Sequence, residues 1–429
     1  MAGEWRSVPF AQLCEHSAFG PRFAGDLYAM DGNVATLRTT DISADGRIEY
    51  DTMPLARLDL SKLQQHTLRR NDLVITRSGR IGTAALFDGF HLPVLPGAFL
   101  IRFRLKTDIA DPFYYRYFFN SPAGQELLNS VATGSVQQNL NITSVHGLQV
   151  PMPPLREQRA IAHILGTLDD KIELNRRMNE TLEAMARALF KSWFVDFDPV
   201  RAKHALSKVE GAKGHPSASS GQAFPGLPKS IADLFPDSFE DSELGEIPKR
   251  WEVGSLDGVL VLQRGFDLPA KQRTSGKYPV LAASGPSGTH NEFMVRGPGV
   301  TTGRSGVLGK VFYIDEDFWP LNTSLWVKEF RHSKPAYALY LLQRIDFALF
   351  NAGSAVPTLN RNHVHNLPTL VPPMGLIDAF ERVATISLQR QNHNDRESNT
   401  LAALRDTLLP KLISGEVRVR DRNIVGRSA

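Results

Sequence analysis

The sequence predicts an α+β protein with a pseudo-two-fold internal repeat, in which two mixed α/β domains are joined by two long antiparallel coiled-coil helices. Three observations lead to this prediction: short segments recur in the same order in both halves of the chain, a proline-rich turn closes each mixed domain, and a long heptad-patterned segment follows each turn. The expected segments are a first domain at 1–150, a first spacer helix at 151–197, a linker at 198–250, a second domain at 251–369, a second spacer helix at 370–415 and a C-terminal tail at 416–429.

The internal repeat consists of matching segments at a nearly constant offset. GSVQQNLN at 134–141 matches GSAVPTLN at 353–360, which is an offset of 219. Further upstream, RSGRIG at 77–82 matches RSGVLG at 304–309 with an offset of 227, as expected when loops differ in length. Ordered matches of this kind indicate two copies of one structural unit.

Each copy passes from short β-rich runs to a proline-rich turn and then to a long helix. Runs such as DLVIT at 72–76 and GKVFYI at 309–314 predict strands. Proline cannot extend a strand ladder but fits the first turn of a helix, so PMPPL at 151–155 and VPPMG at 371–375 mark the junctions.

The first long segment carries a seven-residue repeat, which predicts a coiled-coil seam. Its two rows are Ile161, Leu168, Asn175, Leu182 and Leu189, and Leu165, Ile172, Asn179, Ala186 and Trp193. The second segment is apolar at both ends, at Ile377, Phe380, Val383, Ile386, Leu401, Leu404, Leu408 and Leu412, and polar from 389 to 399. The residues expected to pair the helices or contact other subunits are Leu168, Asn175, Asn179, Leu182, Leu189, Asn394, Leu401 and Leu408.

The repeat relates Asn175 to Asn394, so an antiparallel pair would bring the two polar midpoints together. One interpretation is that buried amides fix the helix register at some cost in stability. The other is that the polar centres are solvated. A helix of forty residues would span about 60 Å and would hold two globules apart, which suits contact with two separated points on a long ligand.

Composition describes an ordinary globular chain with a weak preference for an anionic partner. The formal net charge is +4, but residues 1–150 hold 14 basic and 14 acidic residues, against 12 and 9 at 251–369. The single cysteine, Cys14, cannot form an internal disulfide, which favours a cytoplasmic protein. No run is long and apolar enough to span a membrane, and residues 207–228 are expected to form a flexible insertion.

Motifs for nucleotide hydrolysis, methyl transfer and metal binding were sought, and each candidate fails. A phosphate loop would need glycine at Arg304 and a hydroxyl residue at Val311. The run beginning at Asp111-Pro112 lacks the second proline of an amino-methyltransferase loop, and the histidines have no metal-ligand spacing. These results favour a binding protein without metal ligands or catalytic residues of its own.

The chain resembles the specificity subunits of type I restriction–modification systems over nearly its whole length. The segments that carry the resemblance are LQVPMPPLREQ at 148–158, LFKSWFVDF at 189–197, LGEIPKRW at 244–251, TGRSG at 302–306, FWPLNT at 318–323 and LLPKLISGE at 408–416. The main departure is MGLI at 374–377, where the second junction lacks the Glu-Gln pair of the first.

The resemblance implies a non-catalytic protein that recognises double-stranded DNA. It implies two target-recognition domains, each reading one half of a bipartite, asymmetric sequence. It further implies that the helices act as a spacer and as the dock for two methyltransferase subunits, with restriction/translocase subunits completing the complex. S-adenosylmethionine, ATP and magnesium would then be held by these partner subunits.

Two kinds of loop offer candidate DNA-binding residues. The Arg-Ser-Gly turns can present an Arg fork to guanine or phosphate, and the Gly-Ser…Asn loops carry amides suited to adenine edges. The candidates are Arg77, Ser78, Arg80, Gln137, Gln138, Asn141, Arg304, Ser305, Lys310, Thr358, Asn360 and Arg361. The structural alternatives are a plain hairpin turn for the first kind and helix capping by Asn or Ser for the second.

Two other functions stay open at this stage. A duplicated scaffold that holds two copies of another ligand, without restriction partners, would show the same repeat. A nuclease of an unfamiliar type would be the enzymatic alternative. Adjacent methyltransferase and translocase reading frames would distinguish the type I reading from both.

Overall fold

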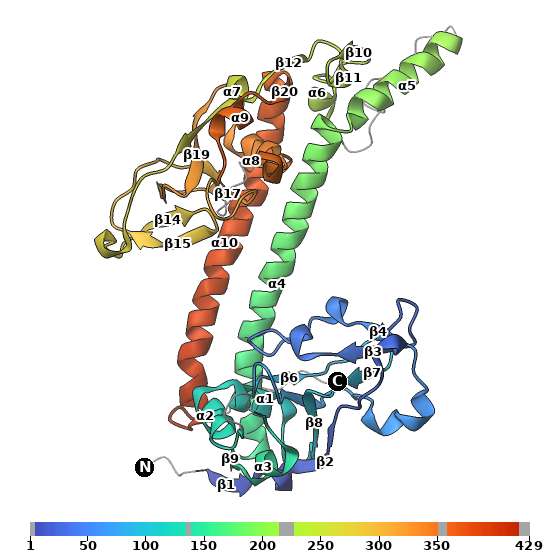
Figure 1. The fold of residues 1–429 in the computed structure, drawn as a ribbon, viewed down its shortest axis with the longest axis vertical. Coiled ribbons are helices and arrows are strands. Elements are labelled where there is room, and N and C mark those ends of the chain that lie inside the picture. The colour runs from blue at the N-terminus through green and yellow to red at the C-terminus, as the bar shows by residue number, and fades with distance from the viewer. Residues whose placement is uncertain (1–4, 134–138, 214–226, 351–357, 420–429) are drawn as a thin grey trace. The chain divides into compact units, whose positions relative to one another are not determined.

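A computed structural model describes residues 5–133, 139–213, 227–350 and 358–419, without the side chains of 206–213 and 348. The chain divides into two compact units (Figure 1). Unit 1 contains Met1–Glu173 and Ser398–Ala429, and unit 2 contains Leu174–Glu397. Gln137 and Gln138 lie outside the described residues.

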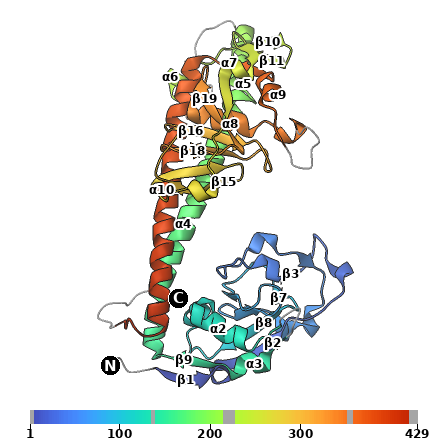
Figure 2. The same cartoon turned by 60° about the vertical axis from the view of Figure 1, so that its left-hand side comes forward.

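Two forty-residue helices, α4 (Leu155–Phe194) and α10 (Met374–Ile413), each contribute one half to each unit. Each begins directly after a Pro-Pro pair, where the missing N–H of proline costs no helical hydrogen bond. Within each unit the two helices lie side by side and antiparallel (Figures 1 and 2). In unit 1 Arg405 of α10 pairs with Asp169 of α4 at 2.8 Å, and in unit 2 Asn394 of α10 donates to Asn179 of α4.

Unit 1 contains three small sheets. Their strands are β1 (Arg6–Pro9), β2 (Cys14–Phe19), β3 (Val34–Leu37), β4 (Leu55–Ala56), β5 (Leu73–Thr76), β6 (Ala84–Leu86), β7 (Val94–Pro96), β8 (Leu100–Leu105) and β9 (Gln149–Met152). The sheet orders are β2-β8-β5-β6, β4-β3-β7 and β1-β9. The β3–β7 pair is parallel and the other pairs are antiparallel.

The part of unit 2 that follows residue 251 repeats this topology strand for strand in its described residues. Its strands are β12 (Glu252–Ser255), β13 (Leu260–Arg264), β14 (Tyr278–Ala282), β15 (Gly285–His290), β16 (Gly299–Gly303), β17 (Val311–Ile314), β18 (Trp319–Pro320), β19 (Ser324–Phe330) and β20 (Pro368–Val371). The orders β13-β19-β16-β17, β15-β14-β18 and β12-β20 reproduce those of unit 1, including one parallel pair, β14–β18. The predicted duplication and the α+β fold class are confirmed.

Short helices cover one face of each four-stranded sheet. They are α1 (Pro112–Asn120), α2 (Pro122–Ser130) and α3 (Ile142–Gly147) in unit 1, and α7 (Leu256–Val259), α8 (Pro335–Gln343) and α9 (Arg361–His365) in unit 2. Asp111 and Ser121 cap α1 and α2 through their side-chain oxygens, and a proline follows each cap. Each core therefore lies between a sheet, these helices and the ends of α4 and α10.

The second junction replaces a polar contact with an apolar one. In unit 1 Glu157 pairs with Arg418 at 2.7 Å, and Gln158, which is fully buried, bonds backbone groups of 109, 111 and 153. Leu376 and Ile377 occupy these two places in unit 2, where they are fully buried in a core that includes Trp251. The missing Glu-Gln pair is thus a consequence of different packing around the same turn.

The apolar face of α10 differs from the expectation at three residues. Ile377 and Phe380 are fully buried, but Val383 and Ile386 are 44% and 68% exposed. The buried face continues at Ala384 and Leu388 instead, because it advances in steps of four residues after Phe380. Leu404, also expected on the apolar face, is 46% exposed.

The segment between the copies is more regular than a flexible insertion. Helix α5 (Asp198–Lys213) covers the first part of the 207–228 stretch, and 214–226 lie outside the described residues. Helix α6 (Lys229–Ala232) and the hairpin of β10 (Phe239–Ser242) and β11 (Gly245–Pro248) follow. The acidic stretch at 237–246 is thus largely a surface hairpin.

Candidate DNA interface

Each Arg-Ser-Gly turn joins two neighbouring strands of the four-stranded sheet. The turn at 77–82 lies between β5 and β6, and the turn at 304–309 lies between β16 and β17. Gly79 and Gly82 have positive φ angles of 77° and 82°, and Gly306 and Gly309 have 86° and 81°. Glycine adopts this conformation without strain, which explains the shared Arg-Ser-Gly-x-x-Gly pattern.

In both units the turn lies beside the second candidate loop. The Leu140 N–H donates to the Arg77 carbonyl at 3.0 Å, and the Leu359 N–H donates to the Arg304 carbonyl at 2.8 Å. Thr358 also forms a β-bridge with Ser305. Residues more than fifty positions apart in sequence therefore form one surface, and they do so twice.

The two turn arginines are held by different neighbours. The guanidinium of Arg77 lies 4.4 Å from the centre of the Phe19 ring. Arg304 instead donates from Nη1 to the backbone carbonyl of Asn322 at 3.3 Å. Both side chains are half-buried, while Arg80 and Lys310 are exposed on their turns. Ser78 is buried and Ser305 is half-buried.

The amide residues of the second loops act as helix caps. Asn141 Oδ1 accepts from the Ser144 N–H at 2.8 Å and caps α3. Asn360 Oδ1 accepts from the Asn362 N–H at 3.0 Å and caps α9. Helix capping thus accounts for the Oδ1 atoms of both asparagines. Arg361, next to Asn360, is exposed.

A repeated histidine beside this surface was missed in the sequence. His146 Nε2 lies 2.8 Å from Ser17 Oγ, and His365 Nε2 accepts from the Leu262 N–H at 2.9 Å. Burial lowers the pKa of both histidines below the ordinary value of 6.5. The signal that would have found them is the repeat itself, because they too are separated by 219 positions.

Unit 1 also contains a buried charged cluster that the sequence analysis did not identify. Arg104 holds both carboxylate oxygens of Asp72, at 2.8 and 2.7 Å. Arg102, 1% exposed, donates to the carbonyls of Gln65 and Thr67, at 2.9 and 3.3 Å. These bonds fix the loop that precedes β5, and hence the start of the strand that leads into the Arg77 turn.

The helix-pairing candidates lie on α4 and α10 and are buried or half-buried. Asn175 and Asn394 are both fully buried. Asn175 donates to Glu397 at 2.8 Å, and Asn394 donates to Asn179 at 2.8 Å. Half-buried leucines complete the set: Leu168, Leu182, Leu189, Leu401 and Leu408. Buried amides and partly buried leucines thus share the seam.

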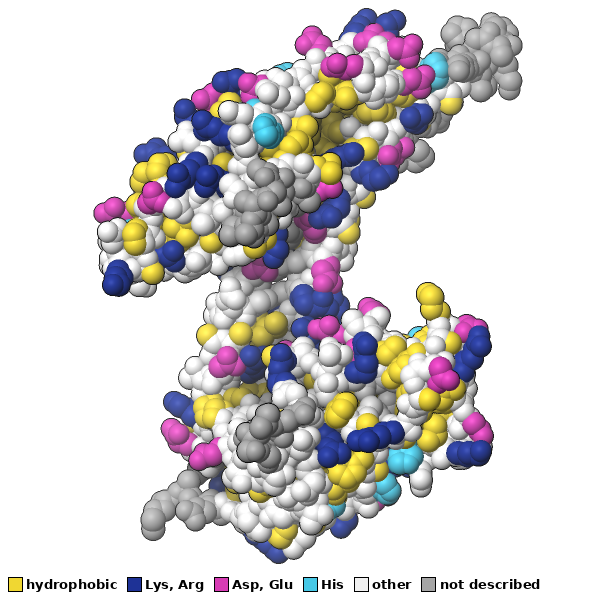
Figure 3. Space-filling view, in the orientation of Figure 1, with side chains coloured by type: hydrophobic (Ala, Val, Ile, Leu, Met, Phe, Trp, Pro, Cys, Tyr) yellow, Lys and Arg dark blue, Asp and Glu magenta, His cyan; other side chains and the backbone are white. Residues whose placement is uncertain are grey.

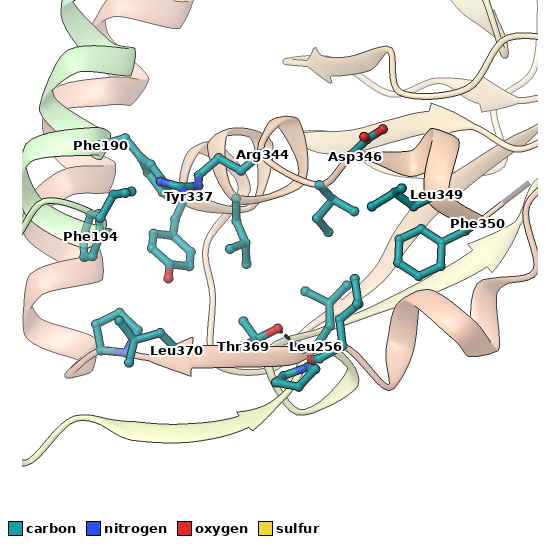
Figure 4. Close-up of a pocket in the computed structure, with 16 residues that line it drawn as sticks. Phe190, Phe194, Leu256, Tyr337, Arg344, Asp346, Leu349, Phe350, Thr369 and Leu370 are labelled. Atoms are coloured by element: carbon teal, nitrogen blue, oxygen red, sulfur yellow. Dashed lines mark hydrogen bonds between the residues drawn. The ribbon is translucent and has the colours of Figure 1, made fainter. Parts of the chain in front are cut away.

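An apolar pocket of unit 2 lies away from the turns (Figure 4). It has a volume of about 360 Å³ and lies between the last turns of α4, helix α8 and strand β20. Phe190, Phe194, Tyr337 and Arg344 lie at one side, and Asp346, Leu349 and Phe350 lie at the other.

The surface of unit 1 is chemically mixed. On the face shown in Figure 3, Lys and Arg side chains lie next to exposed hydrophobic ones. Phe99 and Met30 are among the exposed apolar residues of this unit, at 55% and 100%. In the described part of the chain, no helix has both the length and the apolar character needed to cross a bilayer.

Two copies of one unit, each presenting the same arginine turn and amide loop, define a duplicated binding protein. The family model for the type I restriction modification DNA specificity domain matches residues 3–184 and 248–378, which is more than half of the chain. The chain belongs to this family, and its role is therefore that of a specificity subunit rather than of a catalytic one.

Individual relatives agree with the family assignment. The MjaIX specificity subunit of Methanocaldococcus jannaschii is 24% identical over 340 residues, which cover 74% of this chain and 71% of the relative. The HindI specificity subunit of Haemophilus influenzae is 27% identical over 336 residues, covering 65% and 71%. The solved S subunit from M. genitalium has a similar fold, with a TM-score of 0.62, 18% identity and coverage of 95% and 96%.

Proposed function

We propose that the chain reads a bipartite, asymmetric DNA sequence, with one half-site for each unit. The observation that carries this proposal is the repeated juxtaposition of an Arg-Ser-Gly turn and an amide loop. We assign the two target-recognition domains to residues 1–150 and 251–369. Because the two copies differ in most side chains around the turns, the two half-sites differ in sequence.

The chemistry of the turns suits the major groove of DNA. An arginine fork donates two hydrogen bonds to the O6 and N7 atoms of guanine, and the two glycines that follow it in each turn let the backbone approach the duplex. Exposed Arg80, Lys310 and Arg361 would contact phosphates, which positions the protein without reading sequence. Thr358 and Asn360 Nδ2 would add polar contacts in unit 2, as would Gln137, Gln138 and Asn141 in unit 1.

The long helices would separate the two target-recognition domains and would bind the catalytic partner subunits. We propose two methyltransferase subunits and restriction/translocase subunits as these partners, acting on DNA in the cytoplasm. The exposed apolar residues Val383, Ile386 and Leu404 on α10 offer contact area for such partners. The cofactors of methyl transfer and translocation would be held by those subunits.

The test is to change one turn arginine at a time in the assembled methyltransferase complex. Arg77→Ala should relax base preference at one half-site, and Arg304→Ala at the other, each by the roughly 1–3 kcal/mol that one bidentate contact provides. Methylome sequencing of a host that carries each variant gives the readout. Arg57→Ala, which removes another exposed arginine of unit 1, is the matched control and should leave the motif unchanged. An intact motif in both turn variants would contradict the proposal.

A further inference from the structure

The neighbours of the two turn arginines can be matched atom for atom between the units. The Arg77 N–H donates to the Phe99 carbonyl at 2.9 Å, and the Arg304 N–H donates to the Thr323 carbonyl at 2.8 Å. Phe99 and Thr323 therefore occupy equivalent places. Each lies directly before the strand, β8 or β19, that pairs with the strand leading into the turn.

The residue before a closely packed glycine gives a second match. The Gly20 N–H donates to Leu100 O at 3.2 Å, and the Gly265 N–H donates to Ser324 O at 3.1 Å. A Cβ at Gly20 would lie 2.1 Å from the Gly97 carbonyl, and one at Gly265 would lie 2.3 Å from that of Leu321. The close approach is the same in both units, so Phe19 and Arg264, which precede these glycines, are also equivalent.

The two arginine turns thus have opposite surroundings. In unit 1 Arg77 lies over the half-buried ring of Phe19, and Phe99 beside it is 55% exposed. In unit 2 the corresponding residues are Arg264, whose side chain is 52% exposed and 3.7 Å from Asp267, and the small polar Thr323. At these two places unit 1 has phenylalanine twice, and unit 2 has an arginine and a threonine.

An aromatic ring below a guanidinium has a specific consequence for hydrogen bonding. The ring contacts the flat face of the group, so the N–H donors around its edge stay available to a ligand. Such stacking restricts the guanidinium to one plane, as bidentate binding to guanine requires. An exposed apolar side chain at the same place matches the C5-methyl group of thymine, the one apolar feature on a major-groove base edge.

We propose that Phe19 and Phe99 determine the specificity of unit 1, and that its half-site contains a guanine close to a thymine. Phe19 is a positioning residue that orients Arg77 toward the guanine, and Phe99 contacts the thymine methyl group. Unit 2 has neither aromatic residue and makes only polar contacts at its turn. This proposal rests on the proposed function, because it assumes that the turns face DNA.

The experiment uses the complex assembled with its methyltransferase subunits and duplexes that carry the methylated motif. The half-site of unit 1 is the one that Arg77→Ala relaxes. Replacing its thymine by uracil removes only the methyl group and should weaken binding about fourfold, the usual contribution of one buried methyl group. Replacing its guanine by 7-deazaguanine removes N7 and should weaken binding by tenfold or more.

The variants assign these losses to single residues. Phe99→Thr introduces the residue of unit 2, and this variant should bind thymine and uracil duplexes equally. Phe19→Leu keeps an apolar side chain below the turn but should reduce the discrimination against 7-deazaguanine. Phe113→Thr, at another exposed phenylalanine of unit 1, is the control and should preserve both preferences.

The outcomes separate this proposal from the proposed function. A unit 1 half-site without a thymine or without a guanine overturns the inference, as does a thymine preference that survives Phe99→Thr. In either case an effect of Arg77→Ala on that half-site would leave the proposed function standing. If Arg77→Ala leaves both half-sites unchanged, the proposed role of the turns is itself wrong, and the inference is overturned with it.

Discussion

His146 and His365 occupy the same position in the two units, at the end of the helix that follows the amide loop. His365 Nε2 accepts a hydrogen bond from a backbone N–H, so this nitrogen must carry a lone pair. Burial lowers the pKa of His365, and the nearby charge of Asp257 opposes this effect in part. The neutral imidazole is therefore the form that holds α9 against β13.

Stability should fall at acidic pH because of this contact. The pKa of His365 is lower in the folded state than its ordinary value of 6.5, so the contribution is complete above pH 6.5 and is lost as the pH falls through the folded-state pKa. His365→Gln can still accept the bond and does not titrate. In urea unfolding at pH 7.5 and 5.5, the variant should lose less stability on acidification than the wild type.

The neighbouring histidine provides the control for this measurement. His363 lies on the same short helix but is exposed, so His363→Gln should retain the wild-type pH dependence. Equal pH dependence in wild type and His365→Gln would show that this histidine does not stabilise unit 2.

At the residue scale the sequence located the loops of the candidate interface, but it did not predict the role of each side chain in them. The repeat located the Arg-Ser-Gly turns because two glycines with positive φ constrain the local sequence in both copies. It could not show that Phe19 lies below Arg77, because the two residues are 58 positions apart and the contact depends on how β2, β5 and β8 pair. Asn141 and Asn360 fit both capping and DNA contact by residue type, and only the structure places their Oδ1 atoms at helix termini.

At the element scale the main feature is the polar midpoint of the helix pair. Asn175 and Asn394 are fully buried, and their side-chain amides donate across the α4–α10 contact. A buried amide costs desolvation free energy, which its hydrogen bonds offset only in one register. The buried amides therefore specify the register of the two helices at some cost in the free energy of unfolding.

Substitution of these asparagines should separate the two effects. Asn394→Leu removes the bond to Asn179 Oδ1 and should cost about 1–3 kcal/mol, because a partly buried acceptor loses its donor. Asn179→Leu combined with Asn394→Leu removes both partners of this bond, places two apolar side chains next to each other and should recover most of this loss. Urea unfolding measures both free energies, and Asn399→Leu, at an exposed position of α10, is the control.

The opposite result would have a clear meaning. If the double variant loses at least the sum of the two single losses, the amides contribute net stability to the helix pair.

The elements themselves were largely predictable, and the errors have local causes. Each Pro-Pro pair marked a helix start, and the heptad rows of α4 contain no exposed residue. The face of α10 was misread at Val383 and Ile386, because apolar residues on an outer face look the same in sequence as core residues. Helix α5 was missed because its Gly, Ser and Lys content resembles that of a linker.

At the scale of the whole molecule, duplication explains how one chain would read the asymmetric sequence that we propose. Both units share their sheet topology, including the single parallel strand pair, but differ at the positions that surround the turn arginines. A conserved scaffold with exchanged surface residues permits each unit to acquire a new half-site independently of the other. The two long helices, shared between the units, would then set the spacing between the half-sites.

Exchange of the target-recognition domain of one unit tests this account most directly. Residues 1–150 would be replaced by the corresponding domain of a specificity subunit with a different target, and the methylated motif would be determined by sequencing the host genome. We predict that one half-site changes to that of the donor, while the other half-site and the gap between them stay the same. A chimera that assembles with its methyltransferase subunits but changes both half-sites, or neither, would contradict independent reading by the two units.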